Sequence, residues 1–101
     1  MSHLLFLEEQ ENNKMEKILK RYVLRLKDFP TLFLQRKGTP GNWEYAYTND
    51  ITKALKATSL SLAKDIKQLF YVDTNFTKEE IDFVIVPLTI KYFLEEDNLG
   101  D

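Results

Sequence analysis

Three short stretches in the first half of the chain read as strands, over residues 21–27, 31–37 and 43–48. The first and third carry an apolar residue at every second position, which is typical of strands with one buried face. Pro30 interrupts the first pair, because proline donates no ladder hydrogen bond, and the glycine-rich segment 38–42 separates the second stretch from the third. Short strands joined by tight turns predict an antiparallel meander.

Between residues 59 and 71, apolar residues recur every three to four positions instead of every second one, which predicts a helix. Ser59 is a typical N-cap residue, and the pattern ends at 73–75. The apolar residues at helical spacing are Leu62, Ala63, Ile66, Leu69 and Phe70. The residues expected to face solvent are Lys64, Asp65, Lys67 and Gln68. The apolar stripe of this helix is expected to cover one face of the sheet.

Shorter helical pieces are expected on both sides of this helix. A helix is predicted over 14–20, where apolar residues recur at helical spacing. Asn49-Asp50 offers a cap for a short turn at 51–54. The capping-box spacing Thr77-x-x-Glu80 predicts one further helical turn directly after the main helix.

The C-terminal part of the chain alternates again and predicts a last strand. The apolar residues that share one parity there are Val84, Val86, Leu88, Ile90, Tyr92 and Leu94. Pro87 lies within this run, and proline inside a strand indicates an edge position or a bend.

Together these elements predict an α+β fold. It consists of an antiparallel three- to four-stranded sheet, formed by the meander and the C-terminal strand, with one main helix packed on one face. We expect a single domain over 15–95, an N-terminal extension, helical or frayed, over 1–14, and an acidic tail over 96–101. The 101 residues, 44% of them apolar, suffice for the core of one such domain.

The amino-acid composition limits the kinds of site that the chain can contain and the compartment in which we expect it. Cysteine is absent, which excludes disulfides, thiolate zinc sites and thiol nucleophiles. No apolar run approaches the ~20 residues of a membrane span, and the N-terminus lacks the pattern of a signal peptide. We therefore expect a cytoplasmic protein that does not insert into a membrane.

Charge is distributed unevenly, although the formal net charge is only −2. Residues 14–37 carry eight basic and two acidic side chains, whereas residues 73–101 carry two basic and eight acidic ones. Because both segments include a predicted strand, we expect the basic and acidic parts to lie close together in one sheet.

The residues that catalysis requires are scarce. His3 is the single histidine and lies at the chain end, so a serine nucleophile has no credible base. Helix capping and solubility account for the acidic clusters Glu79/Glu80/Asp82 and Glu95/Glu96/Asp97. The glycines match neither a P-loop nor a dinucleotide fingerprint. We expect no enzymatic activity, no metal and no cofactor.

Binding is the remaining class of function, and two sets of residues are candidates for it. Phe33 is expected among basic residues on one sheet face, where its ring could stack on a base while the basic side chains bind phosphates. The acidic clusters could instead imitate a row of phosphates and occupy a nucleic-acid groove of another protein. The candidate partner-binding residues are Arg25, Lys27, Phe33, Lys37, Glu79, Glu80, Asp82, Glu95, Glu96 and Asp97.

Trp43, Tyr45 and Tyr47 share one face of the third predicted strand. Three aromatic residues at period two are typical of a core that faces a helix. If the helix leaves them uncovered, they become the strongest hot-spot candidates in the chain.

The order of several segments resembles short accessory proteins of phages and prophages of Gram-positive bacteria. The segments are Tyr22-Val23-Leu24-Arg25-Leu26, Phe33-Leu34-Gln35, Trp43-Glu44-Tyr45, Thr48-Asn49-Asp50-Ile51-Thr52-Lys53-Ala54 and Val86-Pro87-Leu88-Thr89-Ile90-Lys91-Tyr92. Some proteins of that kind are anti-CRISPR or other anti-defence inhibitors, which bind a host effector without performing chemistry. The resemblance implies no functional residue at any particular position.

The sequence therefore predicts a non-enzymatic phage-type protein that binds a bacterial host protein, such as a CRISPR effector, and occludes its functional surface. A nucleic-acid-binding accessory protein that uses the basic sheet face is one alternative. A structural homo-oligomer that pairs through its last strand is another, so monomer and homodimer both stay open.

Overall fold

The computed structural model describes residues 14–95 of the chain. Residues 1–13 of the expected extension and the expected tail over 96–101 lie outside these described residues. The contacts divide the chain into two units, one over 20–88 and the other with 14–19 and 89–95 as its described parts.

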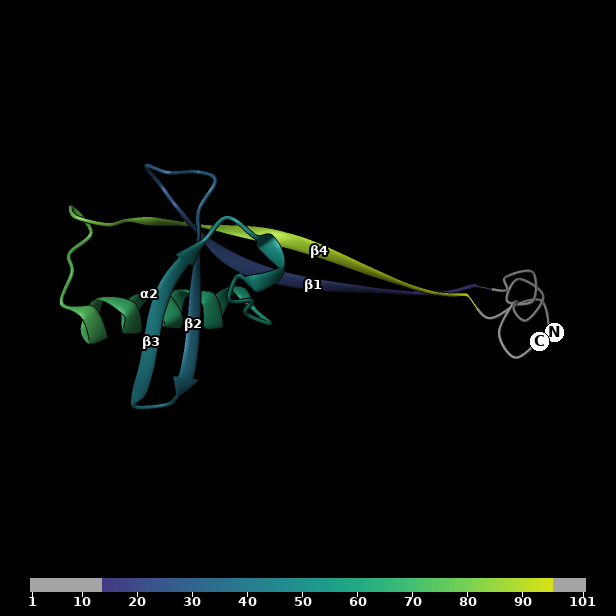
Figure 1. Cartoon of the computed structure of the whole chain (residues 1–101), viewed down its shortest axis with the longest axis horizontal. Helices are drawn as coiled ribbons and strands as arrows, with labels where there is room; N and C mark the ends of the chain where they lie inside the picture. The colour runs from purple at the N-terminus through teal and green to yellow at the C-terminus, as the bar shows by residue number, and fades with distance from the viewer. Residues whose placement is uncertain (1–13, 96–101) are drawn as a thin grey trace. The chain divides into compact units, whose positions relative to one another are not determined.

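Four strands, one α-helix and one short 3-10 helix follow one another within the described residues. Their order is β1 (Lys14–Leu26), β2 (Phe33–Thr39), β3 (Asn42–Thr48), η1 (Ile51–Lys53), α2 (Leu60–Thr74) and β4 (Phe83–Glu95). The strands form one antiparallel sheet in the order β3-β2-β1-β4 (Figure 1). This arrangement confirms the predicted α+β fold, and β4 lies at an edge of the sheet, as Pro87 indicated.

The predicted helix over 14–20 is wrong, because these residues form the first half of the 13-residue strand β1. Ile18, one of the apolar residues at helical spacing, is 55% exposed in the strand. Across this ribbon of β1 and β4, the Lys91 ammonium lies 3.8 Å from the Glu16 carboxylate. Ladder pairing with a distant segment outweighs the local helical spacing, which is a weak preference over seven residues.

Strands β2 and β3 form a hairpin that closes at the glycine-rich turn. Thr39 pairs with Asn42, so Pro40 and Gly41 fill the two central positions. Gly38 has a φ of +110°, and a Cβ on it would lie 2.4 Å from the Asn42 carbonyl oxygen. The turn therefore requires glycine at position 38 for its backbone conformation and for space.

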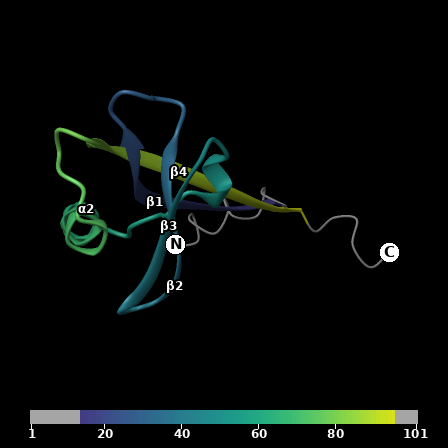
Figure 2. The same ribbon diagram turned by 60° about the vertical axis from the view of Figure 1, so that its left-hand side comes forward.

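The hairpin separates from β1 soon after the two strands meet, and the segment after η1 fills the gap. Arg25 and Phe33 are partners across β1 and β2. The Leu55 N–H donates to the Leu34 carbonyl at 2.9 Å, while Tyr22 and Ala57 exchange backbone hydrogen bonds at 2.8 and 2.9 Å. Figure 2 shows the hairpin of β2 and β3, with α2 viewed nearly end-on.

Helix α2 begins and ends where the sequence predicts. The Ser59 hydroxyl accepts a hydrogen bond from the Leu62 N–H at 3.1 Å, and Asn75 closes the helix in the left-handed conformation. Likewise, the Asp50 carboxylate caps η1 by accepting from the Thr52 N–H. These caps satisfy backbone groups that the helix ends would otherwise leave without partners.

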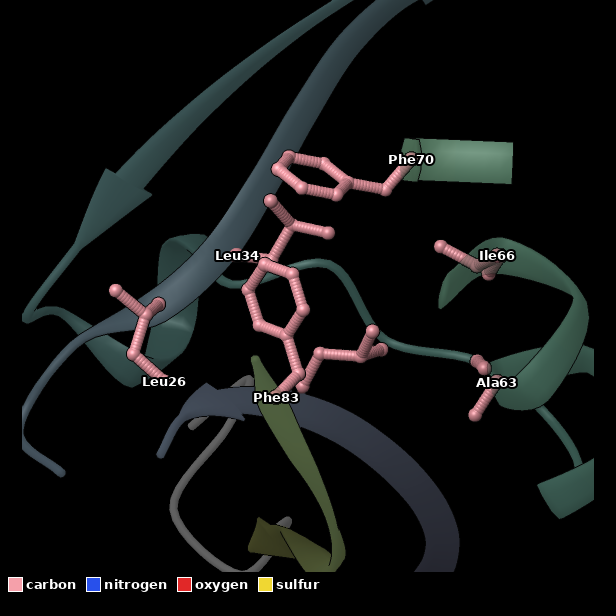
Figure 3. Close-up of a cluster of buried hydrophobic side chains, with 8 residues drawn as sticks. Leu26, Leu34, Ala63, Ile66, Phe70 and Phe83 are labelled. Carbon is pink, nitrogen blue, oxygen red and sulfur yellow. The ribbon is translucent and has the colours of Figure 1, made fainter. Parts of the chain in front are cut away.

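The core lies between α2, the hairpin and the adjoining parts of β1 and β4, and Figure 3 shows Phe70 and Phe83 pointing toward Leu34. The Phe70 and Phe83 rings meet edge to face with centroids 4.9 Å apart. The buried residues of this cluster are Leu24, Leu26, Leu34, Ala57, Ala63, Ile66, Phe70 and Phe83.

Two details of the predicted core are wrong. Leu62 and Leu69 of α2 are exposed, because the stripe that faces the sheet passes through Ala63, Ile66 and Phe70. In β4 the residue buried in the core is Phe83, whereas Val84, on the predicted apolar parity, is exposed; from Val86 to Ile90 the predicted parity is the more buried one. In each element two neighbouring sets of positions are apolar, and the packing decides which set becomes the core.

Candidate protein-binding surface

Trp43, Tyr45 and Tyr47 lie on the side of the hairpin that faces α2. Their cross-strand partners in β2 are Gly38, Arg36 and Leu34, and Leu34 is part of the core. Glycine leaves the space opposite Trp43 open, and the Arg36 guanidinium lies over the indole at 3.8 Å from its centroid. This cation–π contact holds a planar cation against a planar ring at the end of the hairpin.

Tyr45 connects the hairpin to the C-terminal part of α2. Its hydroxyl donates to the Asp73 carboxylate at 2.6 Å, and its ring meets Phe70 edge to face at 5.2 Å. Burial, followed by the hydrogen bond to Asp73 and its charge, raises the pKa of Tyr45 to about 12. The phenol therefore stays neutral and keeps donating at physiological pH.

Tyr47 shares this face, but α2 does not cover it. The side chain is 39% exposed, although partial burial raises the pKa of its phenol. The expectation of an aromatic core is thus confirmed for Tyr45, which packs against the buried cluster. Tyr47 instead remains available to another molecule.

The C-terminal half of α2 and the residue after its cap add exposed apolar side chains. Leu69 precedes Asp73 by four positions and so lies on the same flank of the helix, and Leu69 and Phe76 are both exposed. The Phe76 ring stacks on Phe70 at a centroid distance of 6.1 Å, which ties it to the same aromatic group. We define the aromatic surface as Arg36, Trp43, Tyr45, Tyr47, Leu69, Asp73 and Phe76.

The aromatic surface has the composition of a protein contact. Large, partly exposed aromatic rings are combined with aliphatic side chains, and Arg36 and Asp73 supply opposite charges beside them. Tyrosine, tryptophan and arginine are the residues most enriched in binding hot spots. Protein contacts of this kind gain their affinity from the surface area that they bury, and they require no catalytic side chain.

The structure brings together part of the predicted basic face. Arg25 and Phe33 are direct partners across β1 and β2, but the Arg25 Nε atom is buried without a hydrogen-bond partner. Lys27 and Lys37 are exposed. Lys37 is the cross-strand partner of Glu44, whose carboxylate reduces the positive charge at that end of the face.

The predicted acidic residues near 79–82 have local structural roles. The Glu80 carboxylate accepts hydrogen bonds from Thr77, at 2.9 Å from its N–H and 3.2 Å from its hydroxyl. Residues 78–80 form a hydrogen-bonded turn where a helical turn was predicted. Glu79 is exposed beside them.

Asp82 is part of an ion pair. Its carboxylate lies 3.0 Å from the Lys67 ammonium and accepts the Phe83 N–H at 2.8 Å. The hydrogen bond from Lys67 is the largest cause that lowers the pKa of Asp82 below its ordinary value. Among the other acidic candidates, Glu95 ends β4, and Glu96 and Asp97 lie outside the described residues.

The sequence did not single out the helical half of the aromatic surface. Leu69 was expected in the core, and Phe76 follows the end of α2, so no helical pattern includes it. The available signal was the width of the apolar stripe, since Leu62 and Leu69 extend it beyond the row of Ala63, Ile66 and Phe70 that packs on the sheet.

Comparison with protein-family models, curated proteins and solved structures gives no match. Within residues 14–95, none of the helices combines the length and the apolar character needed to cross a membrane. The function is therefore argued from the geometry of the surface itself.

Proposed function

We propose that the chain is a non-enzymatic binding protein whose aromatic surface docks on a partner protein. The observation that carries this proposal is the pair of exposed rings Tyr47 and Phe76 near the anchored Tyr45. Tyr47 shares the strand face of Tyr45, and Phe76 stacks on Phe70, which Tyr45 also contacts. Exposed apolar side chains that gather in one place mark interaction sites more often than single ones do.

Preorganisation supports occlusion as the mechanism. The Tyr45 ring is held by Phe70 and Asp73, and the Arg36 guanidinium is held over Trp43. Side chains that are ordered before binding lose little conformational freedom when the partner arrives. A rigid surface can then cover an area that the partner needs for its own activity.

The specific partner that we propose is a bacterial defence effector, such as a CRISPR effector, met in the host cytoplasm. Support for this choice is the resemblance of segments within residues 20–94 to phage and prophage accessory proteins. Inhibitors of that kind act stoichiometrically, so the effect should saturate when inhibitor and effector are equimolar.

The test is DNA cleavage by a panel of purified CRISPR effectors in the presence of the full chain. Inhibition by the unaltered chain is expected for at least one effector. The double substitution Tyr47→Ala with Leu69→Asp should raise the inhibitory concentration at least about tenfold, since such hot-spot losses exceed about 1.4 kcal/mol. Phe29→Ala, which removes an exposed ring outside the surface, is the matched control.

Two results would contradict the proposal at different levels. Unchanged cleavage across the whole panel removes the defence effector as the partner. A partner captured from host lysate equally well by the unaltered chain and by the double variant removes the aromatic surface as the docking site. Phe29→Ala should behave as the unaltered chain in both assays.

Nucleic-acid binding through the opposite sheet face is the second candidate. The pairing of Arg25 with Phe33 favours it, because a cation beside a ring suits a phosphate and a stacked base. A labelled oligonucleotide should then gain anisotropy at low salt, and Lys27→Ala should weaken binding and reduce its salt dependence. No anisotropy change at low salt excludes this candidate.

A further inference from the structure

A groove of about 320 Å³ opens on the side of α2 that faces β4. Three of its lining residues are lysines, and none is acidic. Its lining consists of Lys64, Lys67, Gln68, Tyr71, Lys78 and Ile85. Helix α2, the turn that follows it and the first part of β4 thus each contribute to one basic groove, named here the lysine groove.

The helical lining residues form one continuous stripe. Positions 64, 67, 68 and 71 are spaced i, i+3, i+4 and i+7, so their side chains lie one above another. The Tyr71 hydroxyl donates to the Ile81 carbonyl at 2.6 Å, which fixes its ring as a wall of the groove. With Ile85 this ring supplies an apolar side to an otherwise charged lining.

The three lysines differ in how far their charge is compensated. The Lys67 ammonium donates to the Phe83 carbonyl at 2.8 Å and lies 3.0 Å from the Asp82 carboxylate. Asp82 therefore offsets Lys67, and its charge also acts on Lys78 from beyond ion-pair distance. Neither Lys64 nor Lys78 makes an ion pair with the described residues. Two ammonium groups from different elements remain to attract an anion.

We propose that the lysine groove binds a small anion that carries a phosphoryl group. Lysine is a compact charge with three donors on a flexible stem, which suits phosphate oxygens. The volume lies at the lower end of the range for small-ligand pockets, which is about 300–1,000 Å³. The groove lies on the opposite flank of α2 from Tyr45 and Asp73, so this inference goes beyond the proposed function and does not depend on it.

The test is an NMR titration of the isotope-labelled full chain with pyrophosphate, at an ionic strength held constant with sodium chloride. Saturable shifts are expected at the groove residues. Lys64→Gln and Lys78→Gln should each weaken pyrophosphate binding at least about fivefold, since each removes one charge-assisted contact. Lys53→Gln removes an exposed lysine of η1 and should leave the affinity within about twofold.

Further probes separate the phosphoryl group from negative charge in general. Inorganic phosphate should shift the same residues more weakly, and phenyl phosphate should add shifts at Tyr71 and Ile85. Citrate that binds as tightly as pyrophosphate would overturn the phosphoryl assignment. Shifts that spread evenly over all lysines, or that never saturate, would overturn the site itself.

Discussion

Each flank of α2 contacts a tyrosine whose hydroxyl donates a hydrogen bond, but the acceptors on the two flanks differ. On each flank a tyrosine hydroxyl donates at 2.6 Å, from Tyr45 to the Asp73 carboxylate and from Tyr71 to the Ile81 carbonyl. Both rings meet Phe70 edge to face, with centroids at 5.2 and 5.3 Å. The flanks therefore share a geometry around Phe70 and differ in the acceptor and in its exposure.

This difference separates an apolar surface suited to docking a protein from a flank whose contacts stabilise the fold and whose groove is basic. Toward β3 the acceptor is an exposed carboxylate, and apolar side chains such as Leu69 remain uncovered. Toward β4 the acceptor is a partly buried main-chain carbonyl, reinforced by the pair of Lys67 and Asp82. The β4 flank should accordingly contribute more to stability, and the β3 flank more to recognition.

The largest expected effect comes from removing the ring that both flanks share. Phe70→Ala should lower the free energy of unfolding by about 3–5 kcal/mol, because it leaves a cavity between the two tyrosines. Urea unfolding followed by circular dichroism measures this, and Phe29→Ala, at an exposed ring, should cost much less. A loss below about 1 kcal/mol for Phe70→Ala would show that the flanks do not depend on a common centre.

A smaller effect is expected when the β4 flank loses its tyrosine hydroxyl. Tyr71→Phe leaves the partly buried Ile81 carbonyl without its donor, which should cost about 1–2 kcal/mol. Urea unfolding at pH 7 measures the change. A Tyr71→Phe variant as stable as the unaltered chain would contradict the larger contribution of the β4 flank to stability.

The Asp82 charge should make the β4 flank sensitive to acid. Because its pKa is held below the ordinary value of 3.8, chiefly by Lys67, the stabilisation is complete above that pH. It is lost as the pH falls through the lowered pKa, where the folded carboxylate takes up its proton. Asp82→Asn should cost about 1 kcal/mol at pH 7 and should reduce the acid dependence of thermal unfolding.

An Asp82→Asn variant with an unchanged acid profile would mean that other carboxylates cause the acid sensitivity. Asp65→Asn is a matched control, since it removes an exposed carboxylate of α2 that makes no ion pair with the residues that the structure describes.

The smallest effect at neutral pH is expected on the β3 flank. Tyr45→Phe should cost less than about 0.5 kcal/mol, because water solvates the exposed Asp73 carboxylate once the phenol is gone. Both tyrosines have a pKa raised from 10.0 to about 12, so their stabilisation is complete below pH 10 and is lost as the pH rises toward 12. Tyr45→Phe should reduce this alkaline loss, which unfolding curves at pH 9 and 11 measure.

Local signals were sufficient wherever neighbouring residues decide the structure. Alternation predicted strand β3 of the hairpin, and Ser59 marked the start of α2, because a cap and a periodicity act within a few residues. Pro87 correctly indicated an edge strand, since a missing N–H is tolerated there. The α+β arrangement followed from these elements, because each one needs a partner for its apolar face.

The candidate sites depended more on tertiary structure than on sequence. Of the predicted basic face, Arg25 and Phe33 meet, but the predicted acids Glu80 and Asp82 serve a turn and an ion pair. Lys64 and Lys67 looked like ordinary solvated helix positions, and only the packing of α2 against β4 gives them a groove. Spacing along one helix cannot show which strand will lie beside it.

What the residues determined alone was the location of the main helix and the hairpin and the kind of fold that they build. Tertiary structure decided that 14–20 is a strand, that Leu69 is exposed, and that Tyr45 and Tyr71 meet different acceptors. The reason is physical: periodicity and caps act between near neighbours. Pairing and burial join residues far apart in the chain, and these contacts choose between alternatives that local free energies leave nearly equal.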